Sequence, residues 1–272
     1  RMGDFYEMFG PDALDAAPIL GIALTTRDKG KEDAMPMCGV PYHSAHGYIA
    51  RLIKAGRKVA VCEQGEINGK GLVPREVVQV ITPGLIAEDA QLEGRKPNYL
   101  MAVCKSERQD LYGLAFIDIT TGDFRVTELK GLNDFLSEID RVAPSEILAP
   151  SRDLAPGNLY VTLVEAPAQA KAQEILAGHF KTPGVRGLGL PDQGPATIAA
   201  AMALTYVKDK QKAALGGITR LRFYNPGRFM LLGMHTSRNL ELFETLNGAK
   251  EGSLFSLIDQ TDGIELSGAV EL

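Results

Sequence analysis

The chain has 272 residues, 45% of them hydrophobic and 23% charged, which is the composition of a globular protein with a substantial core. This length predicts two or three domains. No apolar run approaches the ~20 residues needed to cross a bilayer, which argues against a membrane protein. The net charge of −5 gives no overall attraction for nucleic acid, although residues 44–62 contain four cations and no acid: Arg51, Lys54, Arg57 and Lys58.

The cysteines indicate a reducing compartment. Cys38, Cys62 and Cys104 are isolated and form no CxxC pair, which argues against both a disulfide framework and a zinc site. We therefore expect a cytoplasmic protein. The chain also opens on Arg1, inside an expected strand and without a signal peptide, so we expect it to be a piece of something longer.

The first nine residues, RMGDFYEMF, carry the most unusual pattern. As a β-strand they place Phe5, Glu7 and Phe9 on one face, with the first two roughly 7 Å apart. A Glu is almost never fully buried without a partner. Two interpretations remain open: Phe5 belongs to a core with Glu7 at the sheet edge, or this end of the strand projects into a ligand.

A compact mixed α/β domain is predicted over residues 1–87, followed by a polar linker at 88–96. Its expected elements after the first strand are a helix at 13–20 capped by Asp12, a strand at 22–27, an irregular segment at 35–43, a helix at 45–55 capped by Ser44, and strands at 58–64 and 75–82. The irregular segment, MPMCGVPYH, shows neither helical nor strand periodicity. It is either a buried loop or a backbone that presents apolar side chains.

A second α/β domain is predicted over 97–216 and a third, incomplete region over 217–272, so the fold class is α/β multidomain. The expected strands of the second domain are 99–104, 111–120, 124–129, 146–149 and 160–165, and its helices are 132–142, 171–180 and 195–212. This order is typical of an α+β or ribonuclease-H-like layer arrangement. The third region is expected to hold helices at 237–246 and 253–260, which are too short to bury their own apolar faces.

Catalytic motifs are scarce. The patterns GxxxxGK[ST], GxGxxG, HExxH and GxSxG do not occur. His43 and His46 have a metal-ligand spacing but no third ligand near them in sequence. One enzymatic alternative remains: Asp118 in a strand and Asp123 in the following hairpin resemble the first carboxylates of a divalent-metal nuclease of the ribonuclease-H-like class. The other interpretation of Asp118 is a buried carboxylate that accepts hydrogen bonds from backbone amides.

Several motifs, in order along the chain, carry a resemblance to one family. They are RMGDFYEMF at 1–9, MPMCGVPYH at 35–43, VCEQ at 61–64, VITPG at 80–84, DITTG at 118–122 and RNLEL at 238–242. The first two resemble the signature segments of the MutS family of DNA mismatch-recognition ATPases, and the last two are similar to its connector and lever-core domains. The match covers about residues 1–261.

The resemblance implies a mismatch-recognition domain at 1–87, a ribonuclease-H-like connector domain at 97–216 and the beginning of a helical lever or core domain at 217–272. It implies that Phe5 wedges into the duplex from the minor groove beside a mispaired base, and that Glu7 hydrogen-bonds this base. Further DNA contacts are expected from the groove-lining pair and from cations on and after the second helix: Pro36, Met37, Arg51, Lys54 and Lys58.

The resemblance also implies a full-length parent that is an ATPase using ATP and Mg²⁺. This parent would bind mismatched duplex DNA as a homodimer and act with a MutL-type partner in the bacterial cytoplasm, at the nucleoid. The chain itself has no phosphate loop, so we expect it to be no enzyme and to bind no cofactor. Two segments depart from the family pattern, the short loop at 65–72 and the last residues at 262–272, and neither is assigned a role.

Overall fold

The computed structural model describes residues 1–27, 34–65, 75–86, 97–226 and 234–259. They fall into two compact units. The first unit comprises Arg1–Gly131 and Pro144–Tyr224, and the second comprises Leu132–Ala143 and the described residues from Asn225 onward. The first unit contains two separate hydrophobic cores, which are described in turn.

The first core lies under a three-stranded antiparallel sheet of order β1-β3-β2. Its strands are β1 (Phe5–Phe9), β3 (Met35–Pro41) and β2 (Thr25–Arg27), and its helices are α1 (Gly10–Leu20) and α2 (Ala45–Lys54). Apolar side chains of both helices pack against the inner face of the sheet: Ala13, Ala16, Ala17, Leu20, Ile49, Leu52 and Ile53.

The prediction of irregular backbone at 35–43 is wrong. Residues 35–41 form the central strand β3, which pairs with β1 on one side and with β2 on the other. Pro36 and Pro41 lie near the two ends of β3, where only one neighbouring strand pairs with them, and at such positions a missing N–H is tolerated. The alternation was hidden because the strand carries apolar residues on both faces.

Helix starts also differ from the prediction. The first helix begins at Gly10, earlier than expected, and its cap is the extended residue Phe9, so Asp12 lies in the first turn and is not the cap. Pro11 occupies this first turn, where the amide needs no partner. Ser44 does precede α2, but its hydroxyl donates to the Pro41 carbonyl at 3.3 Å and caps no helix amide.

The strands β4 (Val59–Gln64) and β5 (Arg75–Ile81) form an antiparallel ribbon, which confirms the two strands predicted there. Its register shifts between Val61 and Cys62. A 3-10 turn at Pro83–Leu85 follows. Leu85 is fully buried in the second core, so the chain has already joined that core before the predicted linker.

The second core is built on a six-stranded sheet of order β10-β9-β6-β7-β8-β11. Its strands are β6 (Leu100–Lys105), β7 (Leu111–Asp118), β8 (Asp123–Lys130), β9 (Glu146–Ala149), β10 (Val161–Leu163) and β11 (Arg222–Phe223). The first three are antiparallel, and β9 and β10 run parallel to β6 on its other side. This is the ribonuclease-H-like arrangement that the sequence predicts. The strand β11 adds to β8 in the parallel direction.

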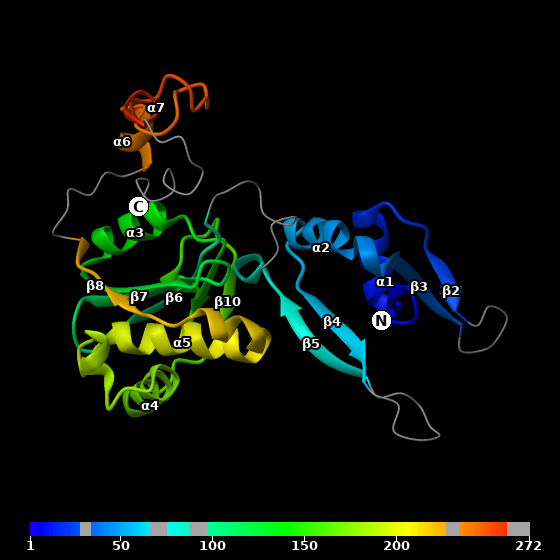
Figure 1. Cartoon of the computed structure of the whole chain (residues 1–272), viewed down its shortest axis with the longest axis horizontal. Coiled ribbons are helices and arrows are strands. Elements are labelled where there is room, and N and C mark those ends of the chain that lie inside the picture. The colour runs from blue at the N-terminus through cyan, green and yellow to red at the C-terminus, as the bar shows by residue number, and fades with distance from the viewer. Residues whose placement is uncertain (28–33, 66–74, 87–96, 227–233, 260–272) are drawn as a thin grey trace. The chain divides into compact units, whose positions relative to one another are not determined.

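Two helices, α4 (Gln169–Phe180) and α5 (Pro195–Lys210), belong to this core (Figure 1). Helix α5 packs directly on β6 and β7, and five of its buried residues are alanines, whose small side chains allow a close approach. Gly113 of β7 makes the closest approach: a Cβ on this residue would lie 2.1 Å from the Pro195 carbonyl carbon. The packing of helix on sheet therefore requires a glycine there.

A buried carboxylate joins the end of β5 to this sheet. Glu146, at the start of β9, is fully buried and accepts hydrogen bonds from four donors. Its Oε1 accepts from Thr162 Oγ1 at 2.6 Å and from the Tyr206 hydroxyl at 3.0 Å, and its Oε2 accepts from the Gly84 amide at 3.1 Å and from Thr82 Oγ1. Burial and the charge of Glu146 raise the pKa of Tyr206, which keeps this hydroxyl a donor.

The second unit contains α3 (Leu132–Val142), α6 (Met234–Asn239) and α7 (Leu254–Ile258). The prediction of a helix over 237–246 is wrong, because α6 ends at Asn239. Glu241 adopts a φ of 49°, which lies outside the right-handed α-helical region. Helix α7 starts as expected, since Ser253 Oγ accepts from the Ser256 amide at 3.2 Å. No helix among the described residues is long and apolar enough to cross a membrane. The linker 88–96 and the segment 262–272 lie outside the described residues, as does most of the loop 65–72.

Candidate nucleic-acid interface

The outer face of the three-stranded sheet carries the residues that the first motif singles out. In the β1–β3 pairing, Phe5 lies opposite Pro41, Glu7 opposite Gly39 and Phe9 opposite Met37. Directly paired residues of antiparallel strands point to the same face. We call this surface the outer face, and its members are Phe5, Glu7, Phe9, Met35, Met37, Gly39, Pro41, Thr25 and Arg27.

Phe5 is not part of the core. Its side chain is 47% exposed, as is that of Met35, and Glu7 and Met37 are half-buried. The alternate residues of β1, Tyr6 and Met8, pack against the first core instead. Of the two interpretations of the first strand, the geometry excludes the buried aromatic ring and leaves an exposed apolar surface with one carboxylate in it.

A cation lies at each end of the outer face. At the Phe5 end, the guanidinium carbon of Arg1 is 3.8 Å from the ring centroid of Tyr42. At the other end, the guanidinium carbon of Arg27 is 5.5 Å from the ring centroid of Phe9. An Arg over an aromatic ring is held in place and still presents N–H donors at its edge. An arginine guanidinium therefore lies at each end of the apolar surface.

The strand β1 is anchored from behind by Tyr6. The Tyr6 hydroxyl donates to Glu63 Oε1 of β4, and the ring packs against the first core. Burial and the hydrogen bond to Glu63 raise the pKa of Tyr6 to about 12. Because neighbouring residues of a strand point to opposite faces, fixing Tyr6 inside fixes the direction of Phe5 and Glu7 outside.

Met37 lies on the same face of the sheet as Phe5 and Glu7, whereas the other predicted contacts do not. Pro36 lies on the opposite face of β3, the face that also carries Cys38. Arg51 and Lys54 lie on α2, which packs on the inner side of the sheet, and the Arg51 guanidinium donates to the Ile19 carbonyl at 3.1 Å. These three positions stay predicted DNA contacts, away from the outer face.

Lys58 contacts residues at and before the strand β10. Its Nζ donates to Thr162 Oγ1 at 3.1 Å and lies 5.9 Å from the ring centroid of Tyr160. Its predicted contact with a DNA backbone is therefore also separate from the Phe5 surface.

Sequence inspection missed several members of the outer face: Arg27, Met35, Gly39 and Pro41. The available signal was the spacing of Met35, Met37, Gly39 and Pro41. These residues are two positions apart, so they share one face if 35–41 is a strand. The link between Tyr6 and Glu63 left no local signal, since these residues are 57 positions apart.

The nuclease hypothesis is not supported. Asp118 is 1% exposed, and its oxygens accept from the Thr120 amide at 2.8 Å, the Thr120 hydroxyl at 2.6 Å and the Asn98 amide at 3.3 Å. Asp123 pairs with Arg125 at 2.9 Å and accepts from the Tyr99 hydroxyl. Within the described ranges, no three His, Cys, Asp or Glu residues gather as metal ligands do. Asp118 is a structural carboxylate, the second interpretation of its motif.

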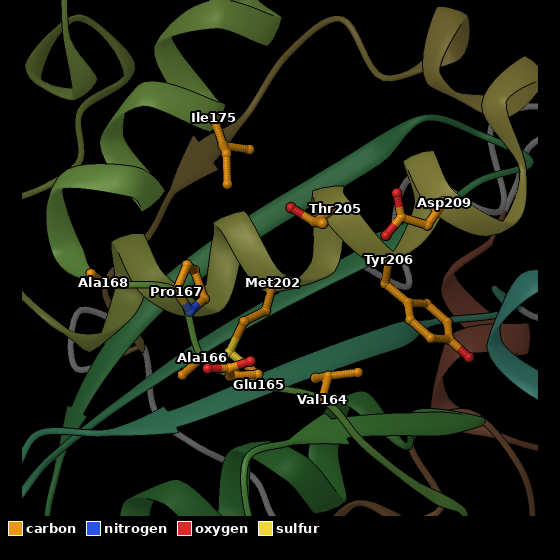
Figure 2. A pocket seen from close by; sticks show the side chains of 10 residues that line it. All are labelled: Val164, Glu165, Ala166, Pro167, Ala168, Ile175, Met202, Thr205, Tyr206 and Asp209. Atoms are coloured by element: carbon orange, nitrogen blue, oxygen red, sulfur yellow. The ribbon is translucent and has the colours of Figure 1, made fainter.

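A cavity of about 420 Å³ in the second core does not suit nucleic acid (Figure 2). Its wall comes from α4, α5 and the segment after β10 and consists of Val164, Glu165, Ala166, Pro167, Ala168, Ile175, Met202, Thr205, Tyr206 and Asp209. The two charged residues of this wall, Glu165 and Asp209, are both acids. Such a lining repels phosphate.

The fold and the outer face define a two-domain arrangement in which a small sheet with an exposed aromatic–carboxylate surface precedes a ribonuclease-H-like domain. Models of known families match both parts: residues 1–90 match "MutS domain I" and residues 98–219 match "MutS domain II". The chain belongs to the MutS family.

Named relatives agree with this assignment. The chain is 42% identical over 274 residues to the "DNA mismatch repair protein MutS" of Syntrophobacter fumaroxidans, covering 96% of this chain and 31% of the relative. It is 41% identical to the proteins of the same name from Desulfosudis oleivorans and Myxococcus xanthus, covering 95% and 96% of this chain and 31% of each relative. The chain thus spans about a third of the length of these relatives.

Proposed function

We propose that this chain recognises mispaired or unpaired bases in duplex DNA, with Phe5 as a wedge inserted from the minor groove and Glu7 as the hydrogen-bonding partner of the displaced base. The observation that carries the proposal is the outer face, where an exposed aromatic ring and a carboxylate lie side by side on one strand. Family membership supports mismatch recognition as the general role.

An exposed ring can detect weak base pairing through the free-energy cost of unstacking a base, without reading the base sequence. Inserting an apolar side chain between base pairs costs a few kcal/mol of unstacking, and less where a pair is already broken. Stacking on a ring then returns ~1–3 kcal/mol for any base, because every base has a π-face. The balance is therefore favourable at a mispair and unfavourable at a matched pair.

Glu7 adds discrimination by repulsion. A carboxylate in a groove bordered by phosphates is unfavourable unless a base donates a hydrogen bond to it. Arg1 and Arg27, at the two ends of the outer face, supply phosphate contacts that fix position without reading sequence. Met37 and Met35 provide apolar surface for a widened minor groove.

The whole protein is proposed to extend beyond this chain. We infer that its full-length form is an ATPase using ATP and Mg²⁺, that it binds DNA as a homodimer, and that its ribonuclease-H-like connector domain passes the signal between DNA and ATPase parts and offers a surface to a MutL-type partner. We also infer that it acts in the bacterial cytoplasm. These inferences rest on family membership and on the match of residues 98–219 to "MutS domain II".

The test is Phe5→Ala in the full-length protein, with binding to a G·T duplex and to its matched counterpart measured side by side. We expect the preference for G·T to disappear, since the wedge is lost. Phe5 is half exposed, so the thermal unfolding temperature should stay unchanged and exclude loss of folding as the cause. A variant that keeps the wild-type preference would refute the wedge.

A further inference from the structure

Gly39 is unusual because it is a glycine in the interior of β3, the central strand of the first sheet. A glycine in a strand interior weakens the strand, since it loses more conformational freedom than other residues and packs nothing. Its position needs a reason, either in the fold or in what the fold binds. The structure allows these two reasons to be separated.

The fold does not require a glycine at this position. Gly39 is absent from the described glycines with positive φ, so its backbone conformation is open to other residues. A Cβ built on Gly39 would lie 3.4 Å from the Tyr6 carbonyl oxygen, at the lower limit of ordinary van der Waals contact. Gly113 of β7 is the contrasting case, because a Cβ there would lie 2.1 Å from the Pro195 backbone.

The space above Gly39 lies between the two residues that the proposed function uses. The same Cβ would be 3.6 Å from Glu7 Cγ and 3.9 Å from Phe5 Cδ1. A side chain longer than a methyl group would therefore fill the gap between the ring and the carboxylate. A strand glycine that the backbone does not need often marks close approach of a ligand.

We infer that Gly39 is a specificity-determining residue: its missing side chain leaves room for one displaced base to lie between Phe5 and Glu7. This inference rests on the proposed function and assigns the space in which the mispaired base is held. The base would contact the Phe5 ring on one side and reach the Glu7 carboxylate on the other, over the bare backbone of β3.

The test compares Gly39→Val and Gly39→Ala with the wild type in the full-length protein. For Gly39→Val we expect the preference for a G·T duplex over matched duplex to fall by about tenfold or more, the scale of one lost base–aromatic stack. Gly39→Ala should show a smaller loss. Thermal unfolding should be unchanged or shifted upward, because a β-branched residue favours a strand.

Two glycines serve as matched controls. Gly47, on α2, has no atom within 4 Å of a built Cβ, so Gly47→Ala should leave the binding preference unchanged and should not lower the unfolding temperature. Gly113→Ala should lower the unfolding temperature strongly, which calibrates a glycine that the fold needs. A fall of that size in Gly39→Val would overturn the inference.

The outcomes separate this inference from the proposed function. If Phe5→Ala loses the G·T preference while Gly39→Val keeps it, the wedge stands and the role of Gly39 is wrong. An equal loss of affinity for both duplexes in Gly39→Val would also overturn it, because general binding and not discrimination was affected. If Phe5→Ala keeps the preference, the proposed function itself fails.

Discussion

The hydroxyl of Tyr6 donates to Glu63, and this contact links β1 to β4 across 57 positions of sequence. Tyr6 lies between Phe5 and Glu7, so the anchor on the inner side sets the direction of the pair on the outer side. Tyr6→Phe removes the hydroxyl and keeps the ring. We expect a loss of about 1 kcal/mol in the free energy of unfolding, measured by chemical denaturation. Glu63→Gln, which keeps an acceptor, should lose less, and the reverse order would contradict this role of the hydroxyl.

The same contact predicts a pH dependence. The pKa of Tyr6 is raised to about 12 by burial and by Glu63, whereas an unfolded Tyr titrates near 10. The folded state therefore holds this proton more tightly, so its stabilisation is complete below pH ~10 and is lost as the pH rises toward ~12. Tyr6→Phe should flatten this decline. Part of it should persist, because the pKa of Tyr99 is also raised to about 12, by burial and by Asp123.

Glu7→Ala should raise affinity for matched duplex in the full-length protein. The carboxylate finds no partner in a fully paired groove, so removing it removes a repulsion. The measurement is a binding titration at two salt concentrations, since a charge effect shrinks as salt rises. Glu7→Gln should behave like Glu7→Ala for matched DNA. Unchanged or weaker affinity in both variants would argue against the repulsive role.

Glu146→Ala should strongly destabilise the first unit. The substitution leaves four donors without their acceptor, among them the Tyr206 hydroxyl and the Gly84 amide, and each buried unsatisfied group costs ~1–3 kcal/mol. We expect a loss of at least about 3 kcal/mol in chemical denaturation. The matched control is Glu174→Ala, because Glu174 is exposed and pairs only at the surface with Lys171, so its loss should stay near ~0.5 kcal/mol.

Asp118→Asn should act on stability and not on DNA cleavage. One amide nitrogen would replace an oxygen that accepts from the Thr120 or Asn98 amide, placing two donors face to face. We expect a loss of ~1–3 kcal/mol in the free energy of unfolding, whether or not Mg²⁺ is present. The wild-type protein should leave a labelled duplex intact in the presence of Mg²⁺ or Mn²⁺. Metal-dependent cleavage that disappears in the variant would restore the nuclease hypothesis.

The sequence predicted most of the second domain because its elements are regular. Strand β7 is a long apolar run, and β8 places apolar residues between charged ones after the turn around Gly122. Helix α3 shows apolar residues at helical spacing. The central strand β3 could not be predicted in this way, since apolar residues on both faces and two prolines hide its alternation. The outer face became definable only when register assigned Met35 and Pro36 to opposite sides.

Long-range contacts set the other limit. Arg51, Lys54 and Lys58 are exposed and stay predicted DNA contacts, but no pattern in sequence showed that Lys58 would donate to Thr162. Likewise the carboxylate of Glu146 reads as an ordinary strand residue until the fold surrounds it with donors. Side-chain partners far apart in the chain depend on packing, which local periodicity does not encode.

The place of β3 between β1 and β2 also bears on which genetic changes the protein tolerates. Both neighbours take their alignment from this one strand, so Met35 and Met37 face outward only while its count of residues is kept. Losing or gaining one codon within Met35–Pro41 would turn Cys38 and Val40 toward solvent and the methionines toward the helices. For this segment we expect a change of length to be the most harmful lesion, because it reverses the faces of several side chains at once.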